Sequence, residues 1–282
     1  MSRIYEALQK AQKEHRNGQS ASVFVIEEMV RPRGEAPPIR EELDRAPFPA
    51  LSAQKVWSPE KRKMLFFDEA DSIGKEQFRT LRSRLYQLRE QRKLSALLIS
   101  SAMAEEGKSF TAANLAHVFA LQRERRVVLV DCDLRRGSLA SFLGTSHTPG
   151  LSEYLSGECS FEEILQTGGP GNFSLVPCGT RVQQPGELIA SQRMAKLMEQ
   201  LRARFDWVIV DTPPATLFSD ASVLADLCDG VLLVVKSGAT PIRLAKNASL
   251  EFKKKSLLGV VLNKSADVLH DSSYYAYASA EA

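Results

Sequence analysis

Residues 100–114 read Ser-Ser-Ala-Met-Ala-Glu-Glu-Gly-Lys-Ser-Phe-Thr-Ala-Ala-Asn. An apolar run at 97–99 enters this stretch, and a helical pattern of apolar residues leaves it between Ala113 and Phe119. The stretch therefore lies on a turn between a strand and a helix, which is the setting that a phosphate-binding P-loop requires. Backbone N–H groups of such a loop point inward at the start of a helix, where the helix dipole also favours negative charge, so they can cradle a triphosphate.

The side chains of this stretch match the chemistry of a P-loop. Ala102 stands where the common motif has its first glycine, and four residues separate it from Gly107. Lys108 is expected to reach the β- and γ-phosphates, and the Ser109 hydroxyl is expected to bind Mg²⁺. The residues predicted to contact the nucleotide here are Ala104, Glu105, Glu106, Gly107, Lys108, Ser109 and Phe110. An ordinary glycine-containing turn between a strand and a helix is the alternative.

Carboxylates follow two strand-like segments downstream. Val-Val-Leu-Val at 127–130 precedes Asp131 and Asp133, and Trp-Val-Ile-Val at 207–210 precedes Asp211. Because parallel strands end on the same edge of a sheet, these carboxylates are expected to gather beside the phosphates and to hold Mg²⁺ and its waters. Together with the loop, they favour a nucleotide site over an ordinary turn.

The composition is that of a globular protein with some irregular sequence. The chain has 282 residues, of which 44% are hydrophobic and 25% are charged, enough for one sizeable core. A net charge of +3 is too mild to indicate a nucleic-acid partner. No apolar run approaches the about 18 residues of a membrane span, and no secretory leader follows Met1, which predicts a cytoplasmic protein. The cysteines and histidines are scattered, so none is assigned to a metal site or to catalysis.

The order of the segments predicts one domain with two extensions. Residues 1–66 are expected to form a short amphipathic helix, docked on its own domain or on a partner, and then a proline-rich arm in which 23–26 could pair at a sheet edge. Residues 67–265 alternate apolar strands with helices, which indicates a three-layer α/β P-loop NTPase fold with a mostly parallel sheet. Residues 266–282 have no apolar stripe and are expected to form a flexible tail.

A helical pattern runs from Phe67 to Arg92. Its apolar stripe consists of Ile73, Phe78, Leu81, Leu85 and Leu88. On the other side Glu76, Arg79 and Arg82 follow one another at spacings of three and therefore share a face. Spacing alone favours a solvated face with ion pairs inside the helix, each worth roughly a few tenths of a kcal/mol.

The tail contains a cluster of aromatic hydroxyls. Three of the six tyrosines of the chain, Tyr274, Tyr275 and Tyr277, lie within four positions of one another. Taken without the P-loop, such a cluster can equally be a chance grouping or a patch on a sheet edge.

Four features occur together in this sequence: the P-loop, the two strands ending in Asp, the Glu-x-x-Arg-x-x-Arg helix and the tyrosine-bearing tail. With these features the sequence resembles the bacterial tyrosine kinases (BY-kinases) of exopolysaccharide and capsule synthesis. Further stretches typical of that family are Asp-Leu-Arg-Arg at 133–136, Gln-Pro-Gly-Glu-Leu at 184–188, Asp-Gly-Val at 229–231 and Gly-Val-Val-Leu-Asn at 259–263. The resemblance runs from about residue 70 to the C-terminus. Family loops often have Pro-Gly-Glu where this chain has Ala104, Glu105 and Glu106.

The resemblance implies roles for the residues of the P-loop and of the two strand ends. Lys108, Ser109 and Thr111 would belong to the Walker A motif of the deviant class, Asp131 and Asp133 to Walker A′, and Asp211 to Walker B. Asp131 would orient or accept the proton of a tyrosine hydroxyl, while Asp133 and Asp211 would hold Mg²⁺ directly or through water. Asn263 would contact the nucleotide, so ATP and Mg²⁺ are the implied cofactors.

The resemblance also implies an assembly and partners. Glu76, Arg79 and Arg82 would form an interface that closes a ring of identical subunits, which reverses the preference from spacing. Tyr274, Tyr275 and Tyr277 would be the phosphate acceptors, phosphorylated in trans within the ring. A membrane-embedded polysaccharide co-polymerase, which regulates chain length, would activate the kinase and recruit it to the inner face of the cytoplasmic membrane.

Two other functions fit part of the pattern. One is a partitioning or septum-positioning (ParA/MinD-like) ATPase switch, but such proteins generally carry an extra lysine early in the P-loop, and residues 101–103 supply none. The other is a regulator of polysaccharide export that binds nucleotide without catalysis. Detection of phosphotyrosine after incubation with ATP separates these alternatives from a kinase.

Overall fold

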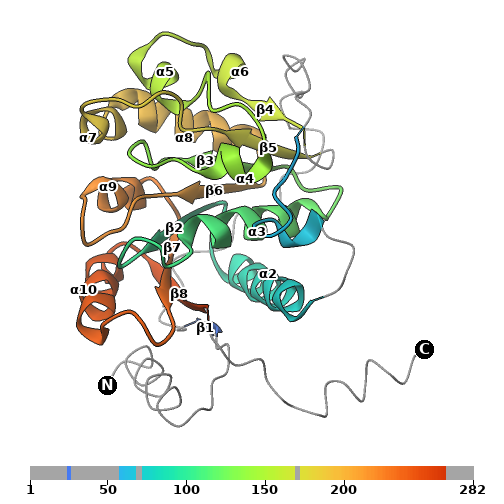
Figure 1. Ribbon diagram of the computed structural model, residues 1–282, viewed down its shortest axis with the longest axis vertical. Coiled ribbons are helices and arrows are strands. Elements are labelled where there is room, and N and C mark those ends of the chain that lie inside the picture. Colours follow the sequence, from blue (N-terminus) through green and yellow to red (C-terminus); the bar gives the residue numbers. More distant parts are fainter. Residues whose placement is uncertain (1–23, 27–56, 68–71, 169–171, 265–282) are drawn as a thin grey trace.

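The structure is a computed structural model that describes residues 24–26, 57–67, 72–168 and 172–264. Within these ranges the chain forms an eight-stranded sheet in the order β1-β8-β7-β2-β6-β3-β5-β4, which runs from near the bottom to near the top of Figure 1. The strands are β1 (Phe24–Ile26), β2 (Ala96–Ser101), β3 (Val127–Asp131), β4 (Gln166–Thr167), β5 (Phe173–Val176), β6 (Trp207–Asp211), β7 (Gly230–Lys236) and β8 (Leu257–Asn263).

The six central strands of this sheet are parallel, and the two edge strands are antiparallel to their neighbours. The predicted mostly parallel sheet is therefore confirmed. β1 pairs with β8 through Val25 and Val260, so the sheet-edge pairing expected for this segment is confirmed for Phe24–Ile26. β4 was not predicted, because two residues are too short to produce an alternating pattern.

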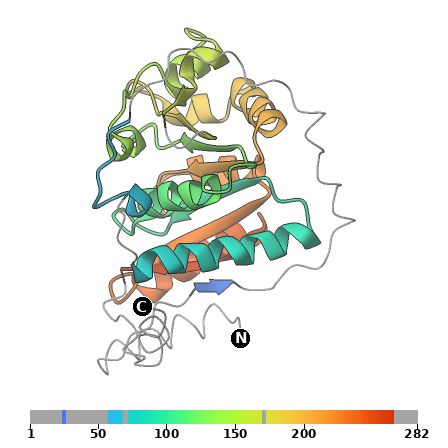
Figure 2. The same ribbon diagram turned by 90° about the vertical axis from the view of Figure 1, so that its right-hand side faces the viewer.

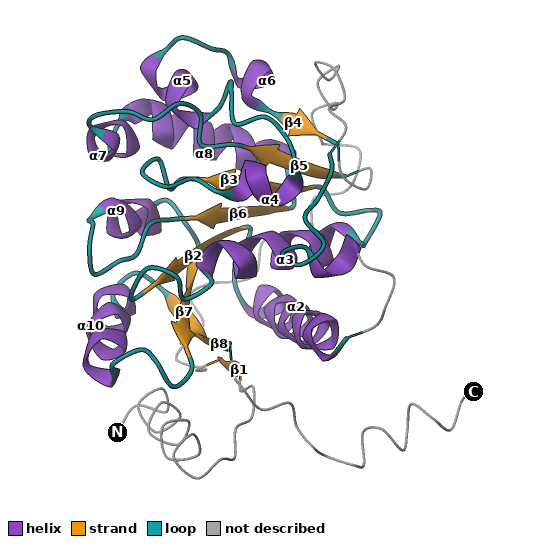
Figure 3. Cartoon of the chain, in the orientation of Figure 1, coloured by secondary structure: helices purple, strands orange, loops and turns teal. Residues whose placement is uncertain are grey.

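Helices cover both faces of the sheet, as Figure 3 shows. They are α2 (Ile73–Gln91), α3 (Lys108–Ala120), α4 (Leu139–Leu143), α5 (Leu151–Ser156), α6 (Phe161–Ile164), α7 (Pro185–Ile189), α8 (Gln192–Arg204), α9 (Asp220–Asp226) and α10 (Ile242–Lys253). Leu97 and Ile99 of β2 pack with α2 and α3, which lie side by side on one face of the sheet (Figure 2). Leu98 packs with α8 and α9. Successive residues of a strand point to opposite faces, so a strand buried on both sides is apolar throughout.

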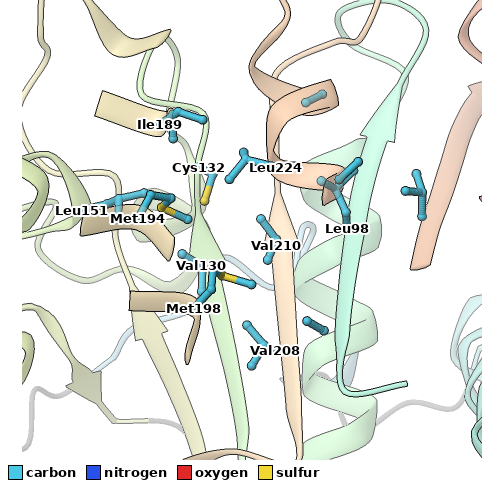
Figure 4. Close-up of a cluster of buried hydrophobic side chains, with 14 of the residues drawn as sticks. Leu98, Val130, Cys132, Leu151, Ile189, Met194, Met198, Val208, Val210 and Leu224 are labelled. Atoms are coloured by element: carbon cyan, nitrogen blue, oxygen red, sulfur yellow. The ribbon is translucent and has the colours of Figure 1, made fainter. Parts of the chain in front are cut away.

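The face covered by α7, α8 and α9 is drawn in Figure 4. Val130 and Val210, on neighbouring strands, lie beneath Met194 and Met198 of α8. All four side chains are at most 2% exposed. Burying a side chain of this size contributes about 1.5–3 kcal/mol, so each of these contacts helps to fix α8 on the sheet.

The N-terminal strap, residues 57–67, packs against the other face. The Trp57 ring meets the edge of Phe173 in β5, with centroids 5.3 Å apart, and Met64 is fully buried. Leu65–Phe67 forms a short 3₁₀ helix. Trp57 and Met64 therefore belong to the core, although the sequence assigned residues 1–66 to the arm, because one tryptophan and one methionine among prolines and charges leave no periodic signal.

A buried asparagine ties the strap to the helix that follows the P-loop. Asn114 of α3 accepts a hydrogen bond from Leu65 N at 2.8 Å and donates to the carbonyls of Lys63 and Phe110 at 2.7 and 2.9 Å. Each of these hydrogen bonds joins the Asn114 amide to a backbone group. The polar side chain is therefore satisfied although it is 0% exposed.

α2 begins at Ile73, later than the predicted start at Phe67. Ser72 caps the helix by accepting a hydrogen bond from Lys75 N at 3.4 Å. Phe78, Leu81, Leu85 and Leu88 form the predicted buried stripe, but Ile73 is 36% exposed. None of the helices in the described part of the chain has the length and apolar character needed to cross a membrane. The predicted helix at 1–17 and the tail at 266–282 lie outside the described residues.

Met64→Ala should lower the free energy of unfolding by about 2–4 kcal/mol, because the cavity it leaves is enclosed by strap, α3 and sheet. Urea unfolding of the full chain measures this loss. The exposed Lys61 provides the control, and Lys61→Ala should change stability by less than about 0.5 kcal/mol. Equal stability of both variants would mean that the strap does not belong to the folded core.

Candidate functional site

The loop at 102–107 connects β2 to α3 at the carboxyl end of the sheet. β2 is a central strand with β6 on one side and β7 on the other. Asp131, the last residue of β3, stands directly opposite Asp211, the last residue of β6, in the parallel register. The structure therefore brings the P-loop and both strand ends to one edge, as the sequence predicted.

The carbonyl groups of the loop are bound from outside it. The Thr216 hydroxyl donates to the carbonyl of Ala102, Lys264 Nζ donates to that of Glu105 at 3.1 Å, and Asn263 Nδ2 donates to that of Glu106 at 2.9 Å. In a trans peptide the C=O and the following N–H point in opposite directions. Holding the carbonyls of Glu105 and Glu106 outward therefore turns the N–H groups of Glu106 and Gly107 toward the inside of the loop, where phosphate would lie.

Gly107 is the cap residue of α3 and has a φ of 95°. A Cβ at this position would lie 1.9 Å from Asn263 Nδ2, so only glycine fits here. The predicted nucleotide-binding residue Asn263 thus contacts the backbone of the loop. Glu105, by contrast, has a φ of 63° without being a glycine, and its side chain is exposed. The family that the sequence resembles often has Gly at the position of Glu105.

Lys108 lies between the loop and the strand ends. Its Nζ is 3.0 Å from Asp133 Oδ2 and 3.3 Å from the Ser109 hydroxyl. Burial alone would lower the pKa of Lys108, but the carboxylates of Asp211 and Asp133 outweigh burial and raise it. Lys108 therefore stays protonated over the physiological range, as a phosphate ligand must.

Asp131 is fully buried and held in place by backbone. Its Oδ2 accepts a hydrogen bond from Leu139 N, the first residue of α4, at 3.0 Å, and its Oδ1 accepts one from Asp133 N at 3.3 Å. Burial and the nearby Asp211 raise the pKa of Asp131 to about 7. A carboxyl group with a pKa near the working pH is suited to proton transfer.

Asp211 supplies the observation that bears most directly on a metal ion. Both of its carboxylate oxygens are buried and have no hydrogen-bond partner within the described residues. Burial raises the pKa of Asp211 to about 6, although Lys108 opposes this shift. Mg²⁺ is usually bound by one or two carboxylates together with water and substrate phosphates. The described residues hold no group of three or more acidic, His or Cys side chains able to bind a metal by themselves.

The remaining predicted site residues lie apart from this group. The Phe110 ring points to α2, 6.0 Å from the ring centroid of Phe78. On α2, Arg79 Nη1 is 3.0 Å from Glu76 Oε2, and Arg82 donates to the carbonyl of Val118 at 2.9 Å. The ion pair predicted inside the helix is therefore present. Tyr274, Tyr275 and Tyr277 lie outside the described residues.

Sequence reasoning missed the residues that hold the loops together. Thr216 and Thr240 lie in irregular segments and belong to no motif, so only their place after β6 and β7 could have indicated them. Arg135 was noted only within a family stretch. It pairs with Asp220 of α9 at 3.0 Å and lies 3.9 Å above the Phe218 ring, joining the loops that follow β3 and β6.

Comparison with known proteins agrees with this geometry. A family described as an AAA domain matches residues 100–241. Tyrosine-protein kinase YwqD of Bacillus subtilis (strain 168) is 35% identical over 205 residues, which cover 72% of this chain and 86% of YwqD. The chain belongs to the bacterial tyrosine-protein kinases.

Two further proteins to which the chain is similar extend the comparison. The kinase domain of Escherichia coli tyrosine kinase ETK superposes with a TM-score of 0.64 at 30% identity, covering 69% of this chain and 78% of that one. The succinoglycan biosynthesis transport protein ExoP of Rhizobium meliloti (strain 1021) is 33% identical over 226 residues, or 78% of this chain. The chain spans only 27% of ExoP, although it spans most of YwqD.

Glu105→Gly should raise the free energy of unfolding by about 1 kcal/mol, because glycine adopts the positive φ at this position without the steric cost that glutamate pays. Thermal or urea unfolding measures the gain. Ala104 is the matched control, since it is an exposed neighbour without a positive φ, and Ala104→Gly should not stabilise the kinase. A loss of stability in Glu105→Gly would contradict the assignment of backbone strain.

Asp211→Asn should raise the free energy of unfolding at pH 8 by about 1–2 kcal/mol in the presence of EDTA. An unfolded Asp ionises near pH 3.9, whereas the folded carboxyl group keeps its proton until about pH 6. The folded chain therefore binds more protons over this window, and wild-type stability falls as the pH rises through it.

Urea unfolding from pH 4 to 8 measures this effect, and the advantage of Asp211→Asn should shrink toward pH 4. The exposed Glu199 of α8 provides the control, and Glu199→Gln should change stability at pH 8 by less than about 0.5 kcal/mol. An Asp211→Asn chain no more stable than wild type at pH 8 would contradict the unfavourable burial of this charge.

Proposed function

We propose that this kinase transfers the γ-phosphoryl group of Mg-ATP to tyrosines of its own C-terminal tail. The observation that carries the proposal is the group at the carboxyl edge of the sheet: Lys108 paired with Asp133, beside two buried carboxylates with raised pKa values, Asp131 and Asp211. Phosphoryl transfer requires positioning and neutralisation of charge more than covalent chemistry, and this group offers both.

Each residue has a role that follows from its chemistry. The N–H groups of the loop and the Lys108 ammonium would bind the phosphates. Asp131 would accept the proton of the tyrosine hydroxyl while the tyrosine oxygen forms a bond to the γ-phosphorus and the bond from that phosphorus to the leaving ADP oxygen breaks. Asp211, Asp133 and the Ser109 hydroxyl would hold Mg²⁺, which neutralises charge on the phosphates when bound.

The acceptors proposed are Tyr274, Tyr275 and Tyr277 on the tail of a neighbouring subunit. A head-to-tail interface through Glu76, Arg79 and Arg82 would close a ring and hold one tail beside the next active site at high effective concentration. Glu76 and Arg79 are about half exposed, which suits an interface role. Each phosphate would add roughly −1.5 to −2 charge near the carboxylates and would loosen the ring by repulsion.

The cellular role proposed is control of exopolysaccharide synthesis and export. The support is the name of ExoP, a succinoglycan biosynthesis transport protein. A membrane-embedded co-polymerase would be the activating partner and would recruit the kinase from the cytoplasm to the membrane, so the purified chain should not bind lipid strongly by itself.

Transfer between chains can be tested by mixing two variants with Mg-ATP. One chain carries Lys108→Met and keeps its tyrosines, and the other is active but carries Tyr274→Phe, Tyr275→Phe and Tyr277→Phe. Phosphotyrosine should appear on the Lys108→Met chain, because only a neighbour can phosphorylate it, and the Lys108→Met chain alone should show at most about 1% of wild-type activity.

The ring is tested in the same mixture. Arg79→Ala in both chains should reduce transfer at least about tenfold, whereas Arg84→Ala, an exposed arginine of the same helix, should not. Absence of phosphotyrosine on the Lys108→Met chain in the wild-type pairing eliminates transfer in trans, and full activity of Lys108→Met alone eliminates the proposed nucleotide site.

A further inference from the structure

A glutamate is buried inside the loop that is proposed to bind phosphate. Glu106 is 2% exposed and directly precedes Gly107 and Lys108. A carboxylate in this position opposes the binding of anions unless its charge is held away from them, since like charges repel strongly where water is excluded. The contacts of Glu106 therefore decide whether the loop can receive a nucleotide.

Two donors hold the Glu106 carboxylate. Its Oε2 accepts the N–H of Met103 at 2.7 Å, and its Oε1 accepts the hydroxyl of Thr240. The Met103 bond closes the loop on itself, whereas the Thr240 bond comes from a different segment of the chain. Thr240 follows β7, the strand that pairs with β2 beside the loop.

The hydroxyl of Thr240 is itself oriented. Lys236 N donates to Thr240 Oγ1 at 3.1 Å, and Thr240 N donates to the carbonyl of Lys236 at 3.1 Å. Because Thr240 Oγ1 accepts from backbone, its own proton is directed to the carboxylate. A donor polarised by a hydrogen bond of its own binds a carboxylate more strongly.

We propose that Thr240 is a positioning residue for nucleotide binding. Its hydroxyl holds the buried Glu106 carboxylate toward the β7 side of the loop, which keeps the negative charge off the phosphates and keeps the Met103 end of the loop closed. The proposal rests on the proposed nucleotide site and adds to it a residue outside every motif of the sequence.

The test compares three full-length variants for binding of Mg-ADP, measured by calorimetry. Thr240→Val has nearly the shape of threonine but lacks the hydroxyl, and it should raise the Kd about tenfold. Thr240→Ser keeps the hydroxyl and should bind within about twofold of wild type. Thr145→Val is the matched control, because it removes a threonine hydroxyl that donates to Gln166 at the far edge of the sheet, and it should leave the Kd within about twofold of wild type.

A second pair of variants separates positioning from loss of structure. If the defect of Thr240→Val comes from a released carboxylate, Glu106→Gln should relieve it, so that the double variant Thr240→Val with Glu106→Gln binds Mg-ADP more tightly than Thr240→Val. A merely structural role of Thr240 predicts instead that the two losses add. The KM for ATP should follow the Kd, while kcat should fall less than threefold in Thr240→Val.

The results distinguish a failure of this inference from a failure of the proposed function. Wild-type affinity in Thr240→Val, or an equal loss in Thr240→Ser, overturns the inference while leaving the nucleotide site intact. Additive losses in the double variant also overturn it. Failure of the wild-type chain to bind Mg-ADP would instead overturn the proposed function. Urea unfolding of every variant shows whether the fold is kept, and the rescue by Glu106→Gln remains a valid test even if Thr240→Val is less stable.

Discussion

The parallel pairing of β3 with β6 places two carboxyl groups, Asp131 and Asp211, side by side at full burial. Burial raises the pKa of both carboxyl groups, and a neighbouring carboxylate raises each further: Asp211 does so for Asp131, and Asp133 does so for Asp211. The site therefore depends on cations to become fully ionised. Lys108 supplies one charge, and the unpartnered oxygens of Asp211 offer a place for a second.

Other elements of the fold hold this pair of buried carboxyl groups and the lysine beside them in place. Asp131 is fixed by the first N–H of α4, so the short helix after β3 has a direct effect on the position of the proposed proton acceptor. α3 begins with the lysine and is joined to the N-terminal strap through Asn114. Residues far from the loop in sequence thereby hold the two elements that carry Lys108 and Asp131, and the strap belongs to the kinase core for this reason.

The P-loop depends on its surroundings as much as on its own sequence. Backbone carbonyls at Ala102, Glu105 and Glu106 are bound by side chains that lie after β6, at the end of β8 and directly after β8. This outer support compensates for a loop that has Glu105 at a positive φ, where a glycine would adopt the conformation without cost. The bacterial tyrosine-protein kinase fold thus accommodates Ala104, Glu105 and Glu106 in place of Pro-Gly-Glu.

The sequence by itself determined the fold class and the edge of the sheet at which the site residues gather. Apolar runs ending in Asp131 and Asp211, and a loop ending in Lys108, fix an α/β P-loop domain because strands buried on both faces have an unmistakable composition and parallel strands end at one edge. Only the tertiary structure decided that Trp57 and Met64 join the core, that α2 begins at Ile73, and that Thr240 and Asn263 hold the loop. Those contacts join segments up to more than a hundred residues apart through single side chains, and a single hydrogen bond leaves no periodicity in the sequence from which it can be predicted.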